Sequence, residues 1–195
     1  MSRKLILEDI QDLRAYERER ESFRAHMIAV KERRRVAIGT LVTVMFENRD
    51  TMRLQIQEML RAEKVMSDDG VLEELNAYNP MVPELGQLCV TLFIELTSDE
   101  AVREWLPKLA GIENSVQIRL SDGTIIRGTL DAQHEAGLTR PEITAAVHYL
   151  TFDFDPAQVE VFARGDVRIE IALSQYLEAT HLSPDVVAEL LSDLR

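Results

Sequence analysis

The sequence of 195 residues predicts an α+β fold, in which a mainly antiparallel sheet of five or six strands is packed by a long N-terminal helix and several shorter helices. Asp122-Gly123 lies between two apolar runs, 116–120 and 124–130, and this dipeptide is typical of a two-residue hairpin turn. Strand and helix patterns do not alternate regularly along the chain, which argues against a doubly wound parallel sheet.

Length and composition favour one domain. The hydrophobic content of 46% is enough for one sizeable core. We therefore expect residues 1–195 to form a single domain, with an N-terminal helix in 1–35 and an α+β body in 36–195.

The net charge of −12 is unevenly distributed. Residues 1–35 carry ten Lys and Arg against seven Asp and Glu, so the net charge of 36–195 is −15. An acidic body repels phosphate backbones, and only Lys31 and Arg33 to Arg35 form a basic cluster, so nucleic acid is not the expected partner. No apolar run reaches the ~18 residues of a membrane span, and the first residues lack a signal-peptide core, so we expect a cytoplasmic protein without membrane contact.

The first half of the body is organised around the helix expected at 50–64, which follows an apolar strand at 36–46. Its apolar stripe is formed by Met52, Ile56, Met59 and Leu60, and the opposite side carries Arg53, Gln57 and Arg61. Glu63 falls within the apolar stripe. If the helix continues through Lys64, Glu63 needs a cationic partner, for which the Arg33, Arg34, Arg35 cluster is the expected source. If the helix ends there, Glu63 reaches water.

The other elements follow from local patterns. We expect helices at 8–35, at 72–75 and after a Thr97/Glu100 capping box, and strands at 87–97, 144–154 and 167–173. Asp155-Pro156 and Ser183-Pro184 open two further helices, and 131–143 is read as a loop. Cys89 falls on the more polar face of its strand, and His148 lies among apolar neighbours, which predicts a buried neutral histidine.

Standard catalytic signatures are missing from the sequence. Four histidines accompany 34 carboxylates, but the only Glu-x-x-His spacing is Glu178 to His181, in an expected loop, whereas a di-iron bundle needs two such motifs on helices. Phosphate-binding glycine loops and Gly-x-Ser-x-Gly are absent. The single cysteine excludes an internal disulfide. The sequence thus predicts no metal site and no cofactor, and a non-catalytic role is favoured over an enzymatic one.

Seven segments, taken in order, resemble a bacterial family, domain of unknown function 3501. They are the helix with Tyr16, Arg20, Phe23 and Arg24, then Phe46-Glu47-Asn48, Gln57-Glu58-Met59-Leu60-Arg61-Ala62-Glu63, Tyr78-Asn79-Pro80, Thr91-Leu92-Phe93-Ile94-Glu95, Leu109-Ala110-Gly111-Ile112-Glu113 and Ala146-Val147-His148-Tyr149-Leu150. Members of that family are typically encoded beside rubrerythrin-like proteins and iron-sulfur oxidoreductases. The resemblance therefore implies a partner of that kind.

Two functional hypotheses follow. In the first, the protein is an accessory or protein-binding module of a redox or oxidative-stress system, which recognises its partner through the face of Arg53, Gln57 and Arg61 and the charged N-terminal helix. In the second, it is a domain that binds a small ligand or a metal, or an enzyme, with a pocket formed by Glu58, Glu63 and His148. The lack of catalytic signatures favours the first.

Overall fold

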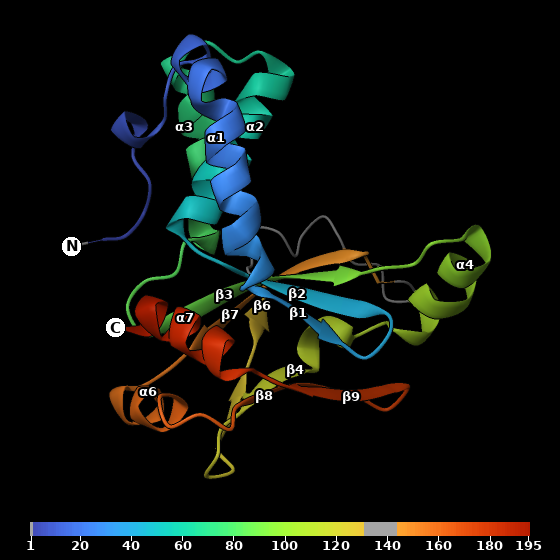
Figure 1. Ribbon diagram of the computed structural model, residues 1–195. Coiled ribbons are helices and arrows are strands. Elements are labelled where there is room, and N and C mark those ends of the chain that lie inside the picture. Colours follow the sequence, from blue (N-terminus) through green and yellow to red (C-terminus); the bar gives the residue numbers. More distant parts are fainter. Residues whose placement is uncertain (1, 131–143) are drawn as a thin grey trace.

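The computed structural model describes residues 2–130 and 144–195 and has an α+β fold with two antiparallel sheets. Three helices, α1 (Leu13–Glu32), α2 (Arg49–Glu63) and α3 (Asp68–Tyr78), rise together from one face of the larger sheet (Figure 1). We call these three helices the helical arm. The smaller sheet, with α6 (Pro156–Phe162) and α7 (Pro184–Leu194), lies on the other side and completes the body (Figure 1). The predicted fold class is confirmed.

The strands are divided between two sheets, where the sequence suggested one. The larger sheet has the order β1 (Arg35–Ile38), β2 (Val42–Glu47), β3 (Gln87–Ile94), β7 (Val147–Asp153) and β6 (Thr129–Leu130). The smaller has the order β5 (Ile125–Arg127), β4 (Val116–Arg119), β8 (Arg168–Leu173) and β9 (Tyr176–His181). The main apolar core fills the space between them. Separation allows each sheet to bury one face against the other.

Two predicted strands are broken by glycine. Residues 36–46 form a hairpin, because Gly39 turns the chain with φ +67° between β1 and β2. The predicted strand 124–130 is interrupted at Gly128, where the chain passes from the smaller sheet to the larger one. A Cβ atom at Gly128 would lie 3.2 Å from the Phe152 ring, which is a tight contact, so glycine allows this close approach without a shift of the ring. The Asp122-Gly123 hairpin is confirmed, and Ile126 is its inward-facing isoleucine.

The segment with Glu178 and His181 is strand β9, and its prediction as a loop is wrong. This strand lies at the edge of its sheet and pairs with β8 through its backbone. Most of its side chains are exposed, so the strand has no apolar alternation that a sequence pattern could reveal. Within the described ranges, no group of three or more His, Cys, Asp or Glu is placed to hold a metal ion.

Several helix limits also differ from the sequence prediction. Helix α1 begins at Leu13, after the carboxylate of Asp12 caps its first turn, while Leu7–Asp9 form a separate 3₁₀ turn, η1. Ser98 caps α4 (Asp99–Lys108), so the predicted Thr97/Glu100 capping box is not formed. Two other 3₁₀ turns, η2 (Asn79–Met81) and η3 (Ile112–Asn114), precede β3 and β4. The predicted loop 131–143 lies outside the described residues.

The larger sheet has different neighbours on its two faces. In β3, Leu88, Val90 and Leu92 face the main core, whereas Cys89 belongs to a second apolar cluster beneath the arm. That second cluster consists of Leu5, Met52, Ile56, Leu60, Leu75, Met81, Val82 and Cys89. Cys89 does lie on the face of β3 opposite Leu88, Val90 and Leu92, as predicted. The arm covers this face, however, so Cys89 is buried and not exposed to solvent. No helix in the described ranges is long and apolar enough to cross a membrane.

Candidate functional site

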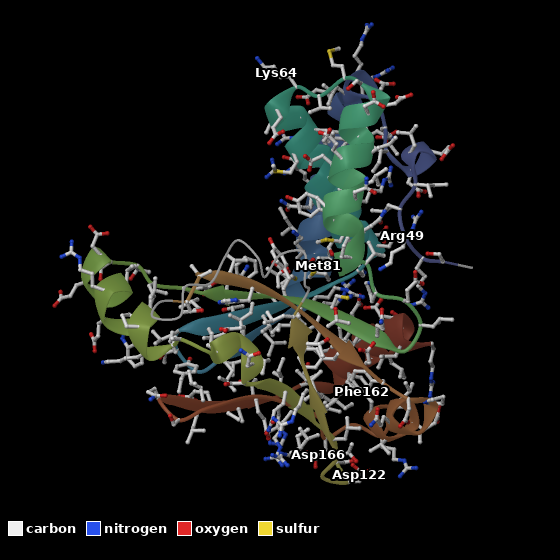
Figure 2. The ribbon with its side chains drawn as sticks, turned by 180° about the vertical axis from the view of Figure 1, so that it is seen from behind. Arg49, Lys64, Met81, Asp122, Phe162 and Asp166 are labelled. Atoms are coloured by element: carbon white, nitrogen blue, oxygen red, sulfur yellow. The ribbon has the colours of Figure 1, made fainter. Side chains whose placement is uncertain are left out.

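The residues predicted as a binding face all lie on α2, which runs from the base of the arm to its tip. Figure 2 shows Arg49 near the sheet and Lys64 at the far end of the helices. Asn48 begins α2: its side-chain oxygen accepts a hydrogen bond from the backbone N–H of Thr51, and the Thr51 hydroxyl oxygen accepts one from the backbone N–H of Asn48. Lys64 ends it in the left-handed conformation, with φ 57°. The face opposite the apolar stripe turns toward α1 and the N-terminal segment.

Glu58 joins α2 to α1. Its carboxylate accepts a hydrogen bond of 2.6 Å from the Tyr16 hydroxyl and two of 2.8 Å from the Arg20 guanidinium. This bidentate pair, followed by the Tyr16 hydrogen bond, lowers the pKa of Glu58 to about 2 despite partial burial. Burial and the same carboxylate raise the pKa of Tyr16 well above its usual range. Glu58 is thus an ionised group that holds two helices together.

Gln57, Arg53 and Arg61 also have partners, in α1 or in the N-terminal segment that precedes it. Gln57 is fully buried; its amide accepts from the Gln11 N–H at 2.8 Å and donates to the Gln11 carbonyl at 3.1 Å. Arg53 donates to the Asp9 carbonyl at 2.9 Å, and its guanidinium lies 5.2 Å from the centre of the Phe23 ring. Arg61 forms a bidentate pair with Glu17 at 2.7 and 3.1 Å.

The predicted recognition face is therefore largely an internal surface. It fixes α1 and the N-terminal segment on α2, and the buried Gln57 has no surface to offer a partner. Asn79 provides a second attachment of the same kind, because its side-chain amide forms hydrogen bonds of 2.8 and 2.9 Å with both backbone groups of Leu5. The helical period of α2 was correct, but the sequence does not reveal that a preceding segment covers its polar side.

Glu63 is exposed, and its predicted buried ion pair with the arginine cluster is wrong. Helix α2 ends at Glu63, so this side chain never enters the core. Arg34 is buried elsewhere, with hydrogen bonds of 2.6 Å to Asp193 and 3.0 Å to Glu189. Arg35 pairs with Glu95. The alternative, in which the helix ends and Glu63 reaches water, is the correct one.

His148 lies on the opposite face of the larger sheet from α2. It lies on the same face of β7 as the core residues Leu150 and Phe152. Its Nε2 lies 2.7 Å from Thr144 Oγ1 and 2.9 Å from the Ala145 carbonyl. Burial lowers its pKa, against an opposing effect of Glu113. The geometry is that of the predicted buried neutral histidine. Glu58, Glu63 and His148 consequently do not form the common pocket that the second hypothesis requires.

Cys89 does not have the environment of a reactive thiol. Its side chain is buried, and its Sγ lies 3.5 Å from Thr151 Oγ1. Burial raises the pKa of Cys89 to about 11, so that the thiol remains protonated at neutral pH.

The tip of the arm contains a cavity of about 250 Å³, which we call the tip cleft. Its apolar lining comes from the N-terminal segment and all three helical elements, with Leu7, Ile10, Leu13, Leu60, Val65 and Val71. Met66 lines it as well and is 84% exposed. Ile6 and Leu72 are 58% and 45% exposed, and they are next in sequence to the lining residues Leu7 and Val71. Such a concentration of exposed apolar side chains at one end of an elongated arm is typical of an interaction surface.

Helix α3, which forms one wall of the tip cleft, is acidic throughout. It carries Asp68, Asp69, Glu73 and Glu74 and no Lys or Arg. Asp68 lines the cleft itself, and the other polar lining residues are Gln11, Asp12 and Arg14, from the N-terminal segment and α1. Partial burial and then the charges of Glu63 and Glu73 raise the pKa of Glu74 above its usual value. The cleft is therefore apolar inside and negatively charged along this side.

Sequence reasoning missed the tip cleft because its lining residues come from four separate segments. The available signal was local: Val65 and Met66 are apolar residues in a short turn, where polar residues are expected. The exposure of Met66 and the partial burial of Val65 follow only from the packing of α2 against α3.

These elements define an α+β protein with a body of two sheets and a projecting helical arm. Residues 4–194 match the family described as Protein of unknown function (DUF3501), and the chain belongs to that family. A crystal structure at 1.90 Å resolution, of a novel protein of unknown function from Burkholderia pseudomallei K96243, has a TM-score of 0.90 and 36% sequence identity, and the match covers 98% of this chain and 100% of that chain. No curated protein matches the chain.

Proposed function

We propose that the protein is a protein-binding module, whose helical arm docks a partner protein at the tip cleft. The observation that carries the proposal is the apolar cleft with the exposed side chains of Ile6, Met66 and Leu72 around it. Its volume of about 250 Å³ is smaller than the ~300–1000 Å³ typical of small-molecule sites. A space of this size suits one or two apolar side chains of a partner.

The construction of the arm supports this proposal. The Glu58 pairs with Tyr16 and Arg20, together with the Gln57 and Asn79 attachments, hold the N-terminal segment and α1 against α2 and η2. A surface that is rigid before binding loses less conformational entropy when a partner docks. The arm also projects away from the sheets of the body (Figure 1), and the residues that line the tip cleft belong to this arm and to the N-terminal segment.

For the identity of the partner, the proposal rests on the family resemblance alone. An iron-sulfur oxidoreductase or a rubrerythrin-like protein is the candidate, which would make this chain an accessory protein of a redox system. The wild-type protein should then retain one such protein from an extract of its native host, identified by mass spectrometry.

The test compares two double variants in that experiment. Met66→Ser with Leu72→Ser removes exposed apolar surface at the cleft, whereas Leu85→Ser with Leu177→Ser removes similarly exposed leucines elsewhere, which are 63% and 70% exposed. Retention of the same partner should be lost only with the first pair, while circular dichroism shows both variants folded. Equal retention by both variants would overturn the docking proposal, and a partner without redox function would overturn only its redox part.

A further inference from the structure

The carboxylates of α3 have no cationic partners in the part of the chain that the structure describes. Asp68, Asp69, Glu73 and Glu74 take part in none of the ion pairs there. On the other two helices of the arm, by contrast, Glu58 pairs with Arg20 and Glu17 pairs with Arg61. Asp68 and Asp69 lie in the first turn of α3, where the helix dipole favours negative charge. Glu73 and Glu74 lie beyond that turn and have no such compensation.

The acidic wall and the apolar cleft belong to the same surface. Asp68 and Val71 line the cleft together, and Leu72 is exposed beside Glu73 on the same helix. Glu63, at the end of α2, is close enough to Glu74 for their charges to repel. A docked group that carried negative charge would add to this repulsion, whereas Lys or Arg side chains would relieve it while apolar side chains filled the cleft.

The local architecture also limits the conformation of the docked segment. The walls of the cleft are helices, the turn between α2 and α3, and the N-terminal segment before α1. None of the lining residues belongs to a strand, so the cleft offers no strand edge to which an extended peptide could add. An amphipathic helix that inserts apolar side chains into a groove between helices is the corresponding mode of recognition. The exposed Met66 thioether is flexible and adapts readily to the shape of such side chains.

We infer that the tip cleft binds an amphipathic helical segment of a partner protein, with apolar side chains in the cleft and Lys or Arg along the edge that faces α3. This inference rests on the proposed function and specifies the chemistry of the partner. The main competing occupant is a second copy of this chain, because α1 exposes Arg14, Arg18 and Arg24.

The inference is tested with a defined probe and the whole protein. The probe is a fluorescently labelled helical peptide of about 16 residues with Leu on one face and Lys on the other, and the comparison peptide has Glu in place of every Lys. Fluorescence anisotropy measures Kd at low and moderate salt. We expect the Lys peptide to bind at least about tenfold more tightly than the Glu peptide and to lose affinity as salt increases.

Charge-neutral variants assign the effect to the acidic wall. Asp68→Asn with Glu73→Gln and Glu74→Gln should weaken binding of the Lys peptide about tenfold. The matched control, Glu100→Gln with Glu178→Gln and Asp185→Asn, removes three exposed carboxylates from the body and should change Kd less than about twofold. Equal binding of both peptides, or equal losses in both variants, would overturn the inference.

Two outcomes distinguish this inference from the proposed function. If the native partner is lost with Met66→Ser and Leu72→Ser but is unaffected by neutralising α3, the docking function stands and the basic-helix inference fails. If sedimentation velocity shows a concentration-dependent dimer that disappears on neutralising α3, the surface belongs to a second copy and the inference is overturned.

Discussion

Replacing Glu58 by Gln should destabilise the arm in a manner that depends on pH. The pKa of Glu58 is about 2, compared with 4.5 for an ordinary glutamate. A difference of this size corresponds to at most about 3.4 kcal/mol, at about 1.4 kcal/mol for each pKa unit. The side chains of Arg20 and Glu58 are 24% and 29% exposed, so solvent screening reduces the effect, and we expect a loss of about 1–2 kcal/mol at pH 7.

The sign of the pH dependence follows from the lowered pKa. The folded protein favours the ionised carboxylate, so its stabilising effect is fully present above about pH 4.5 and is lost as the pH falls through about 2. The measurement is urea unfolding of wild type and Glu58→Gln between pH 7 and pH 2, followed by circular dichroism. The difference in unfolding free energy between the two proteins should shrink steadily below pH 4.5.

The control for this experiment is Glu17→Gln, which removes the carboxylate of the more exposed Arg61 pair. Its side chains are 41% and 55% exposed, so the destabilisation should be markedly smaller than that of Glu58→Gln. A Glu58→Gln effect that is constant with pH, or no larger than that of the control, would refute the argument that Glu58 stabilises the arm as an ion.

Three further substitutions test the buried and exposed charges. Glu47 is buried, its Oε2 has no hydrogen-bond partner within the described residues, and burial raises its pKa, so the wild type loses stability as pH rises above about 4.5. At pH 8, Glu47→Gln should therefore be more stable than wild type by about 1–3 kcal/mol and have a higher Tm. At pH 4 the two proteins should have the same Tm, and a lower Tm of the variant at pH 8 would contradict this. Glu63→Gln should change the free energy of unfolding measured in urea by less than about 0.5 kcal/mol, and a larger loss would restore the buried-pair hypothesis. Arg34→Ala leaves Asp193 without its partner and should cost about 3–5 kcal/mol in urea unfolding, so that a near-neutral result would show that the pair is solvated.

The local sequence patterns predicted those elements whose apolar period was uninterrupted. Strand β3, strand β7 and the helix beginning at Pro156 follow this rule, and Ser183 and Asp155 are the expected N-caps. The hairpin at Asp122-Gly123 depends only on its turn residues, which are adjacent in sequence. Edge strand β9 was missed because backbone pairing, and not apolar burial, holds it in place.

The arrangement of the polar residues could not be predicted in the same way. The helical period correctly separated Gln57 from the apolar stripe, but burial of Gln57 depends on Gln11, which is 46 positions away in sequence. Glu58 likewise depends on Tyr16 and Arg20 of another helix. The sequence pattern specifies which side of a helix is polar, whereas tertiary packing determines whether that side faces water.

The larger sheet separates two apolar clusters that have no residue in common, one in the body and one beneath the arm. Because each cluster supports its own elements, we expect the arm and the body to unfold as two cooperative units, which are joined through β2 and β3. Transient opening of the smaller arm cluster would then leave the hydrogen bonds of the central strands intact. Amide hydrogens of α1 to α3 should accordingly exchange faster than those of β3, and a partner bound at the tip would slow exchange throughout the arm without changing the protection of the body.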